Sequence, residues 1–307
     1  MPYPFSSVVR SPSGGYIYPD SSSCIYCGEQ QGLTTEHIIP KGLYGDLIFP
    51  ASSCDACRNI TSGLESFVLQ RVLGFHRRRF GYPSQTKKKR RNPIRGSIYR
   101  HEQDGSETEI ELDGGDLPLW SFTLPVYGHP MLVGLGTEKE QCSGDKIHAV
   151  VSGMDAAMAL AIPSGTRPVS LPPMVYDAGK FMRFIAKVAH SYATAALGRD
   201  SFNPLLSGLI REGHDIPRVW IGGEPEIPPE ESNVYSITLG IVERYDQEKF
   251  LAARIRILDY LGTPVYTAIV GSNFEGNLSS INHCSYAKPI KATVIGRDGM
   301  PIFSTEG

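Results

Sequence analysis

Two CxxC pairs, CIYC at 24–27 and CDAC at 54–57, constrain the fold of this chain more than any other sequence feature. Thiolates are soft ligands that suit Zn²⁺, and a CxxC turn presents two sulfurs to one ion. Four cysteines leave no coordination position for water, so the ion is expected to be structural rather than catalytic. The predicted zinc ligands are Cys24, Cys27, Cys54 and Cys57. The alternative is two pairs of unligated thiols.

The two remaining cysteines and the expected lack of a secretory signal favour an intracellular protein. Cys142 and Cys284 stand alone, so the six cysteines do not suggest a disulfide scaffold. The first residues show no basic segment followed by an apolar core, as a secretory signal would. No apolar run reaches the 18 or so residues needed to span a bilayer. We therefore expect a cytoplasmic protein with no membrane partner.

The chain divides by composition into four segments. Its 307 residues can bury one large core or two ordinary ones, and 23 prolines with 32 glycines argue against an all-helical fold. We predict an irregular lead-in at 1–20, a cysteine region at 21–80, a basic linker at 81–96 and a second domain at 97–307. The predicted fold class is α+β: a small zinc-stabilised module followed by a larger α+β domain with antiparallel sheet.

Hydrophobic periodicity places one helix in each predicted domain. Apolar residues at helical spacing predict a helix over about 55–75, directly after the second CxxC pair. A second helix is predicted over 176–198, with Gly198 as its C-cap. Its polar positions are expected to face solvent, or alternatively to extend a nucleic-acid surface: Arg183, Lys187, His190 and Thr194.

The rest of the second domain has the pattern of β-strands. Residues 97–112 read as two strands that turn at Asp104-Gly105. Three more strands are predicted at 233–243, 250–260 and 263–270, the last two paired across Leu261-Gly262.

The segment between the cysteine pairs carries the groups that suggest chemistry. Glu36 and His37 open the run EHIIP at 36–40, and Asn59 follows the second cysteine pair. A shared zinc ion would pull the start of the 55–75 helix against the strand that carries Glu36 and His37. A carboxylate, an imidazole and a carboxamide would then converge. Oxygen ligands suit a hard cation such as Mg²⁺ or Mn²⁺, and an unligated histidine can accept a proton from water.

At these residues the chain resembles the HNH nucleases of the His-Me finger group, whose core is a ββα-metal fold. The matching pieces are EHIIP, the flanking pairs CIYC and CDAC, and the RN that follows, all within 20–80. The resemblance implies a metal-dependent endonuclease with His37 as general base and Glu36 as a metal ligand, where many members have Asp. It also suggests a setting in restriction or antiviral defence.

The helix-borne metal ligand departs from the family pattern. The position directly after the second pair is often His or Asn in the family and is Arg58 here, with Asn59 one residue later. Asn59 is the predicted second ligand and Glu65 a substitute. The rival functions are a non-catalytic zinc-containing nucleic-acid-binding protein and an RNA-cleaving nuclease.

A strongly basic segment follows the cysteine region. Residues 66–100 contain eleven Lys or Arg and no Asp or Glu, although the whole chain has a formal charge of −2. Clustered cations neutralise phosphates, so nucleic acid, DNA in particular, is the predicted partner; a solvated linker is the alternative. A homo-oligomer is compatible with the sequence. The predicted phosphate-binding residues are Arg77, Arg78, Arg79, Lys87, Lys88, Lys89, Arg90 and Arg91.

Overall fold

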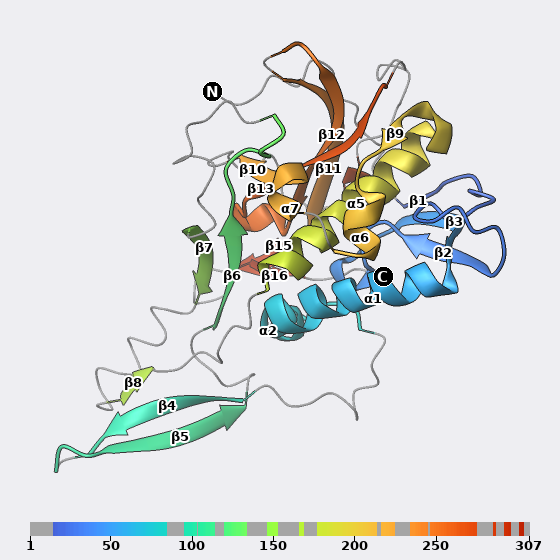
Figure 1. The fold of residues 1–307 in the computed structure, drawn as a ribbon. Helices are drawn as coiled ribbons and strands as arrows, with labels where there is room; N and C mark the ends of the chain where they lie inside the picture. Colours follow the sequence, from blue (N-terminus) through green and yellow to red (C-terminus); the bar gives the residue numbers. More distant parts are fainter. Residues whose placement is uncertain are drawn as a thin grey trace.

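The structure is a computed structural model with α+β architecture and mainly antiparallel sheets (Figure 1). It describes residues 15–84, 95–102, 104–113, 120–133, 146–152, 166–168, 177–213, 216–224, 234–244, 246–274, 285–286, 292–295 and 301–303. None of the helices in these ranges is long and apolar enough to cross a bilayer.

The cysteine region contains a three-stranded sheet followed by helices. The sheet order is β1-β3-β2, with β1 parallel and β2 antiparallel to β3. Its elements are β1 (Tyr16–Ile17), β2 (Leu33–His37), the 3₁₀ helix η1 (Lys41–Leu43), β3 (Leu47–Cys54), α1 (Asp55–Phe67), the π-helical turn η2 (Val68–Val72) and α2 (Gly74–Arg79). The predicted helix over 55–75 therefore starts as expected, but the π-turn and Leu73 divide it before α2.

The main sheet of the second region is antiparallel, in the order β10-β13-β12-β11-β14, with β9 also paired to β13. The three strands predicted at 233–270 are confirmed as β11, β12 and β13. The turn from β12 to β13 passes through Leu258 and Gly262, both with positive φ. The sheet strands are β9 (Asn203–Pro204), β10 (Ile221–Glu224), β11 (Tyr235–Glu243), β12 (Lys249–Ile257), β13 (Val265–Ser272) and β14 (Ser285–Tyr286).

Smaller sheets and short helices complete the described part. The predicted hairpin at 97–112 is confirmed: β4 and β5 pair antiparallel around Gly105, whose φ is +83°. The remaining strands are β4 (Arg95–His101), β5 (Glu107–Asp113), β6 (Trp120–Val126), β7 (Lys146–Ser152), β8 (Thr166–Pro168), β15 (Ala292–Ile295) and β16 (Pro301–Phe303). The short helices are η4 (Arg199–Ser201), α6 (Ser207–Arg211), α7 (Pro217–Trp220) and η5 (Asp259–Leu261).

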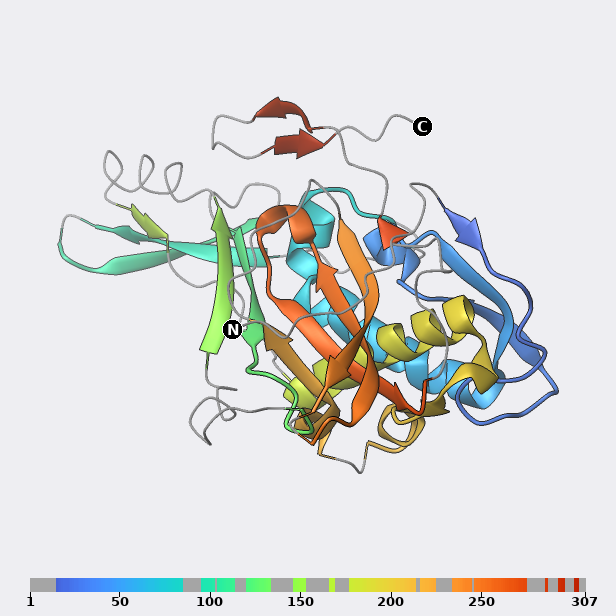
Figure 2. The same cartoon turned by 90° about the horizontal axis from the view of Figure 1, so that it is seen from above.

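The long helix α5 (Ala178–Leu197) lies at the centre of the molecule. It packs against β12 and β13 on one side and against α1 on the other, as both views show (Figures 1 and 2). Asp177 caps its N-terminus by accepting a hydrogen bond from the Lys180 amide, and Gly198 follows its last turn. The predicted helix over 176–198 is thus confirmed.

The prediction that the polar positions of this helix face solvent is wrong. Lys187, His190 and Thr194 are all buried, because α5 is covered on both sides by other elements. His190 donates from Nε2 to the Ile25 carbonyl at 2.8 Å, and Ser191 bonds the Tyr26 hydroxyl at 2.8 Å. Helix α5 therefore packs directly on the first CxxC turn.

One hydrophobic cluster runs through both regions. It includes Ile38 and Leu64 from the cysteine region, Phe184 and Val188 from α5, and Ile255 from the main sheet. The strand end that carries His37 is therefore supported by elements that lie far away in the sequence. The division of the chain into two domains, at 21–80 and 97–307, stays a prediction.

Candidate metal centre and active-site pocket

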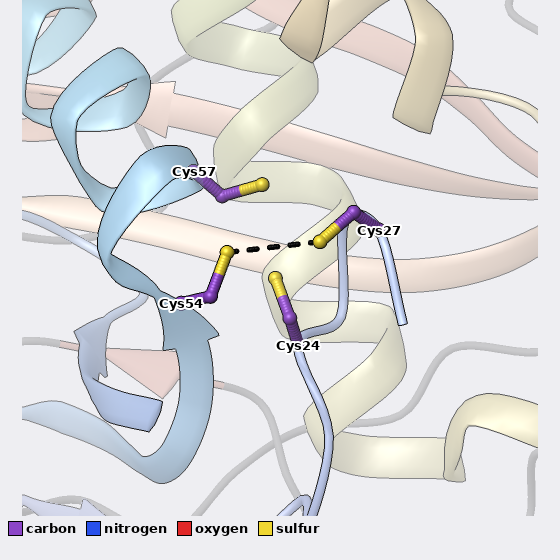
Figure 3. A group of neighbouring side chains, drawn as sticks. All are labelled: Cys24, Cys27, Cys54 and Cys57. Carbon is purple, nitrogen blue, oxygen red and sulfur yellow. Dashed lines mark hydrogen bonds between the residues drawn. The ribbon is translucent and has the colours of Figure 1, made fainter. Parts of the chain in front are cut away.

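The four predicted zinc ligands lie together at the junction of the first CxxC turn and the start of α1 (Figure 3). All four sulfur atoms lie within 4.8 Å of one another, and the Sγ atoms of Cys27 and Cys54 are 3.6 Å apart. Tetrahedral zinc with Zn–S bonds of about 2.3 Å holds its sulfurs roughly 3.8 Å apart. The donor set and its spacing therefore fit a metal ion such as zinc.

Local backbone geometry explains why each pair presents its sulfurs together. In the first pair, Gly28 donates to the Cys24 carbonyl at 2.8 Å and has a φ of +85°, a conformation that glycine adopts without strain. In the second pair, Cys54 ends β3 and forms the N-cap of α1, and Cys57 lies in the first turn of the helix. A metal ion held by these sulfurs would join the first turn to the strand–helix junction.

Strands β2 and β3 set the positions of Glu36 and His37. Glu36 pairs with Phe49 and His37 with Ile48, after an irregularity in the ladder beyond Thr34. Such an irregularity changes the direction of the side chains that follow it. As a result Glu36 is buried and His37 is partly buried at the end of the strand.

A pocket of about 720 Å³ lies beside this strand end. Its lining includes Glu36 and His37 from β2 and Arg58, Thr61, Ser62 and Glu65 from α1. Thr61 and Ser62 lie three and four residues after Arg58, and Glu65 lies four and three residues after them, which places all four on one face of the helix.

Asn59 and Glu65, the two candidate helix-borne ligands, lie in different places. Asn59 is exposed and is not among the residues that line the pocket, because it lies about 100° around the helix from Arg58. Glu65 lines the pocket together with His37. The structure therefore brings Glu36, His37 and Glu65 together, and leaves Asn59 outside.

Lys187 of α5 contacts Glu36, His37 and Glu65 but does not itself line the pocket. Its Nζ lies 2.5 Å from Glu36 Oε1 and 2.6 Å from Glu65 Oε1, and it donates to the His37 carbonyl at 2.5 Å and the Ile38 carbonyl at 3.2 Å. The Lys187 side chain has no exposed surface. The sequence analysis placed Lys187 on an exposed helix face and did not connect it with Glu36, His37 or Glu65.

Burial and neighbouring charges set the protonation of these groups. Burial would lower the pKa of Lys187, but the Glu36 and Glu65 carboxylates outweigh it and hold the pKa above its ordinary value. Burial raises the pKa of Glu36, and the Lys187 charge opposes that rise. Burial, with Lys41 and Lys187 nearby, lowers the pKa of His37. The His37 imidazole is therefore neutral at pH 7, as a proton acceptor must be.

His37 also has an unused hydrogen-bonding atom. Its Nε2 is buried, with no hydrogen-bond partner in the described part of the chain. Buried polar atoms without partners are rare in folded proteins and often mark a place for water or ligand.

The predicted phosphate-binding arginines differ in what they contact. Arg77 donates to the carbonyls of Gly42, Leu69 and Pro83 at 2.6–2.8 Å, so its guanidinium fixes the pocket wall. Arg78 is exposed and lines the pocket. Arg79 lies in α2. Lys87, Lys88, Lys89, Arg90 and Arg91 fall outside the described residues.

Two further cations complete the pocket lining. Lys41 of η1 is exposed, and Arg58 of α1 pairs with Asp55 at 2.9 Å on the helix surface. Together with Arg78 they form a cationic rim in the lining of the same pocket as Glu36 and Glu65. Comparison of the chain with family models, curated proteins and solved structures finds no match.

Proposed function

We propose that the protein is a metal-dependent, HNH-type endonuclease that hydrolyses phosphodiester bonds in DNA. The observation that carries the proposal is the pocket that places His37, Glu36 and Glu65 together between a strand end and a helix. The order β2, β3, α1, with the four cysteines at the helix start, is the order expected of a ββα-metal module. A role in restriction or antiviral defence rests on the family resemblance alone.

His37 serves as the general base in this proposal. A neutral imidazole at the pocket wall accepts a proton from water, which then attacks phosphorus. A zinc ion held by the four cysteines would have no open coordination position and would take no part in this step. It would hold the start of α1 against β2, and residues of both elements line the pocket.

The carboxylates of Glu36 and Glu65 are the proposed ligands of a catalytic divalent cation. Carboxylate oxygens are the ligands that Mg²⁺ and Mn²⁺ prefer, and both side chains line the pocket and share Lys187 as a neighbour. When bound, such an ion neutralises charge that develops on the phosphate. We assign the helix-borne ligand to Glu65 rather than Asn59, because Asn59 lies outside the pocket.

The cationic rim is the proposed contact for the nucleic-acid backbone. Lys41, Arg58 and Arg78 line the pocket, and phosphates bind such groups without regard to base sequence. Arg77 supports this surface because its guanidinium donates to the backbone carbonyls of Gly42, Leu69 and Pro83.

A second candidate function is a non-catalytic zinc-containing protein that binds nucleic acid. It is favoured by the contact of both carboxylates with the Lys187 ammonium, which leaves less negative charge for a divalent ion.

Divalent-ion titration tests the proposed function. Supercoiled plasmid and single-stranded RNA are incubated with zinc-loaded protein over a range of Mg²⁺ or Mn²⁺ concentrations. We expect plasmid nicking that rises with the ion and saturates. Glu65→Gln should raise the half-maximal ion concentration at least about tenfold, since a charged ligand is removed, and Asn59→Ala should leave it unchanged. Plasmid left intact at every ion concentration would instead support the non-catalytic nucleic-acid-binding protein. Faster cleavage of RNA than of plasmid would identify RNA as the substrate.

Neutralising the basic cluster at 87–91 should weaken DNA binding and its dependence on salt. Changing all five residues to glutamine is expected to reduce the slope of log K against log salt by about 0.9 for each phosphate that the cluster neutralises in the wild-type complex. The measurement is fluorescence anisotropy with a labelled duplex at several salt concentrations. Lys249→Gln with Arg211→Gln, two exposed cations outside the pocket lining, is the control. An unchanged slope would show that the cluster contacts no phosphate.

A further inference from the structure

Lys187 contacts the pocket's catalytic candidates, and neither the resemblance nor the zinc site explains its presence there. It comes from α5, 150 residues beyond His37, and its side chain is fully buried. It is not among the residues that line the pocket. The ammonium therefore lies behind Glu36, His37 and Glu65, away from any substrate in the pocket.

The number of close acceptors around the Lys187 ammonium equals the number of its protons. A lysine ammonium has three protons, and three acceptors lie at 2.5–2.6 Å: Glu36 Oε1, Glu65 Oε1 and the His37 carbonyl oxygen. The Ile38 carbonyl lies farther away, at 3.2 Å. All these acceptors belong to the catalytic strand end or to the pocket face of α1.

A buried charge with this set of partners is not explained by stability alone. Well-packed apolar residues are often as stabilising as a buried ion pair, so core stability does not require a lysine at this position. A single atom that bonds β2 and α1 together fixes the distance between the two walls of the pocket. It also fixes the main chain of His37, and so restricts where the imidazole can lie.

We propose that Lys187 is a positioning residue of the active site, which holds the His37 main chain and the Glu36 and Glu65 carboxylates in their working arrangement. The site is then completed by α5, and residues 21–80 are not sufficient for it. The inference rests on the proposed function and extends it, because Lys187 acts through residues that contact the substrate rather than on the substrate itself.

The test compares Lys187→Met and Lys187→Arg with a matched control, Arg183→Met, in the full chain. Arg183 lies one turn earlier on α5 and also binds backbone carbonyls, those of Ile210 and Arg211, away from the pocket. We expect Lys187→Met to lower kcat for plasmid nicking about 10²-fold, since displaced catalytic groups lose that much, with KM within threefold of wild type. Lys187→Arg keeps the charge but has a larger, planar head group, so a smaller loss of kcat is expected.

Hydrogen exchange gives a measurement that does not depend on activity. In Lys187→Met the amides of 33–43 should exchange about tenfold faster, and those of β11–β13 should keep their protection. In Arg183→Met both kcat and the protection of 33–43 should stay at wild-type values. Zinc content and Tm establish that each variant is folded. If Lys187→Met fails to fold, Lys187→Arg is judged by the same two readouts.

The outcomes separate this inference from the proposed function. Wild-type kcat and protection in a folded Lys187 variant would overturn the inference, as would exchange that rises equally across the whole chain. If wild-type protein cuts no nucleic acid, the proposed function fails. Hydrogen exchange at 33–43 then still decides whether Lys187 holds this strand end.

Discussion

His37→Ala should reduce divalent-dependent nicking of plasmid by about 10²–10⁴-fold, the range expected when a general base is removed. The reason is the place of His37: it lines the pocket beside Glu36 and Glu65, its pKa is lowered by burial, and its Nε2 lacks a partner among the described residues. The measurement is the initial rate at saturating Mg²⁺ or Mn²⁺ with equal amounts of folded protein.

The His37→Ala protein must be shown to fold like the wild type, so that it differs from it only in lacking the imidazole. Zinc content near one ion per chain and an unchanged Tm would establish that, because His37 is only partly buried and ligates no zinc in this arrangement. Gln31→Ala, an exposed change two residues before β2, is the matched control and should keep the full rate. A His37→Ala protein that nicks plasmid at the wild-type rate would refute the mechanism.

The parts of the site that local sequence determines were predictable. A CxxC turn places two sulfurs together by its own backbone geometry, and a shared zinc ion was expected to bring the two pairs together; the clustering of the four cysteines is confirmed. Helix α1 and strands β11–β13 follow from periodicity that is local in the sequence. The proximity of Glu36 and His37 to the helix was predicted from the same pairing of cysteines, and residues of β2 and α1 do line one pocket.

The residues that prediction misplaced depend on contacts distant in sequence. Lys187 was assigned to solvent because a lysine on an amphipathic helix usually lies there, yet α5 is covered by α1 on one side and the sheet on the other. The residues three and four positions away from Lys187 on the helix are Arg183, Phe184, His190 and Ser191, mostly polar, so no local pattern indicated its burial. Arg77 likewise has carbonyl partners at 42, 69 and 83 that no local pattern reveals.

Cys57→Ser should remove the bound metal and unfold the cysteine region. Structural zinc contributes about 10–16 kcal/mol in small zinc domains, which equals or exceeds the roughly 5–15 kcal/mol stability of a whole domain. Cys57 lies in the first turn of α1, and buried residues of α1, α5 and the main sheet belong to one cluster. We therefore expect the loss to spread beyond residues 21–80, with a large fall in Tm and loss of nicking. Atomic absorption and thermal unfolding measure the two effects.

The chain supplies its own control for this experiment. Cys142→Ser and Cys284→Ser make the same chemical change at the two cysteines outside the CxxC pairs, and they should keep one zinc ion and the wild-type Tm. Since a Cys₄ site has no spare ligand, each of the four paired cysteines should behave as Cys57 does. A Cys57→Ser protein that retains zinc and melts at the wild-type temperature would mean that no metal joins the first CxxC turn to α1. The pocket walls would then depend on α5, and on Lys187 in particular, for their arrangement.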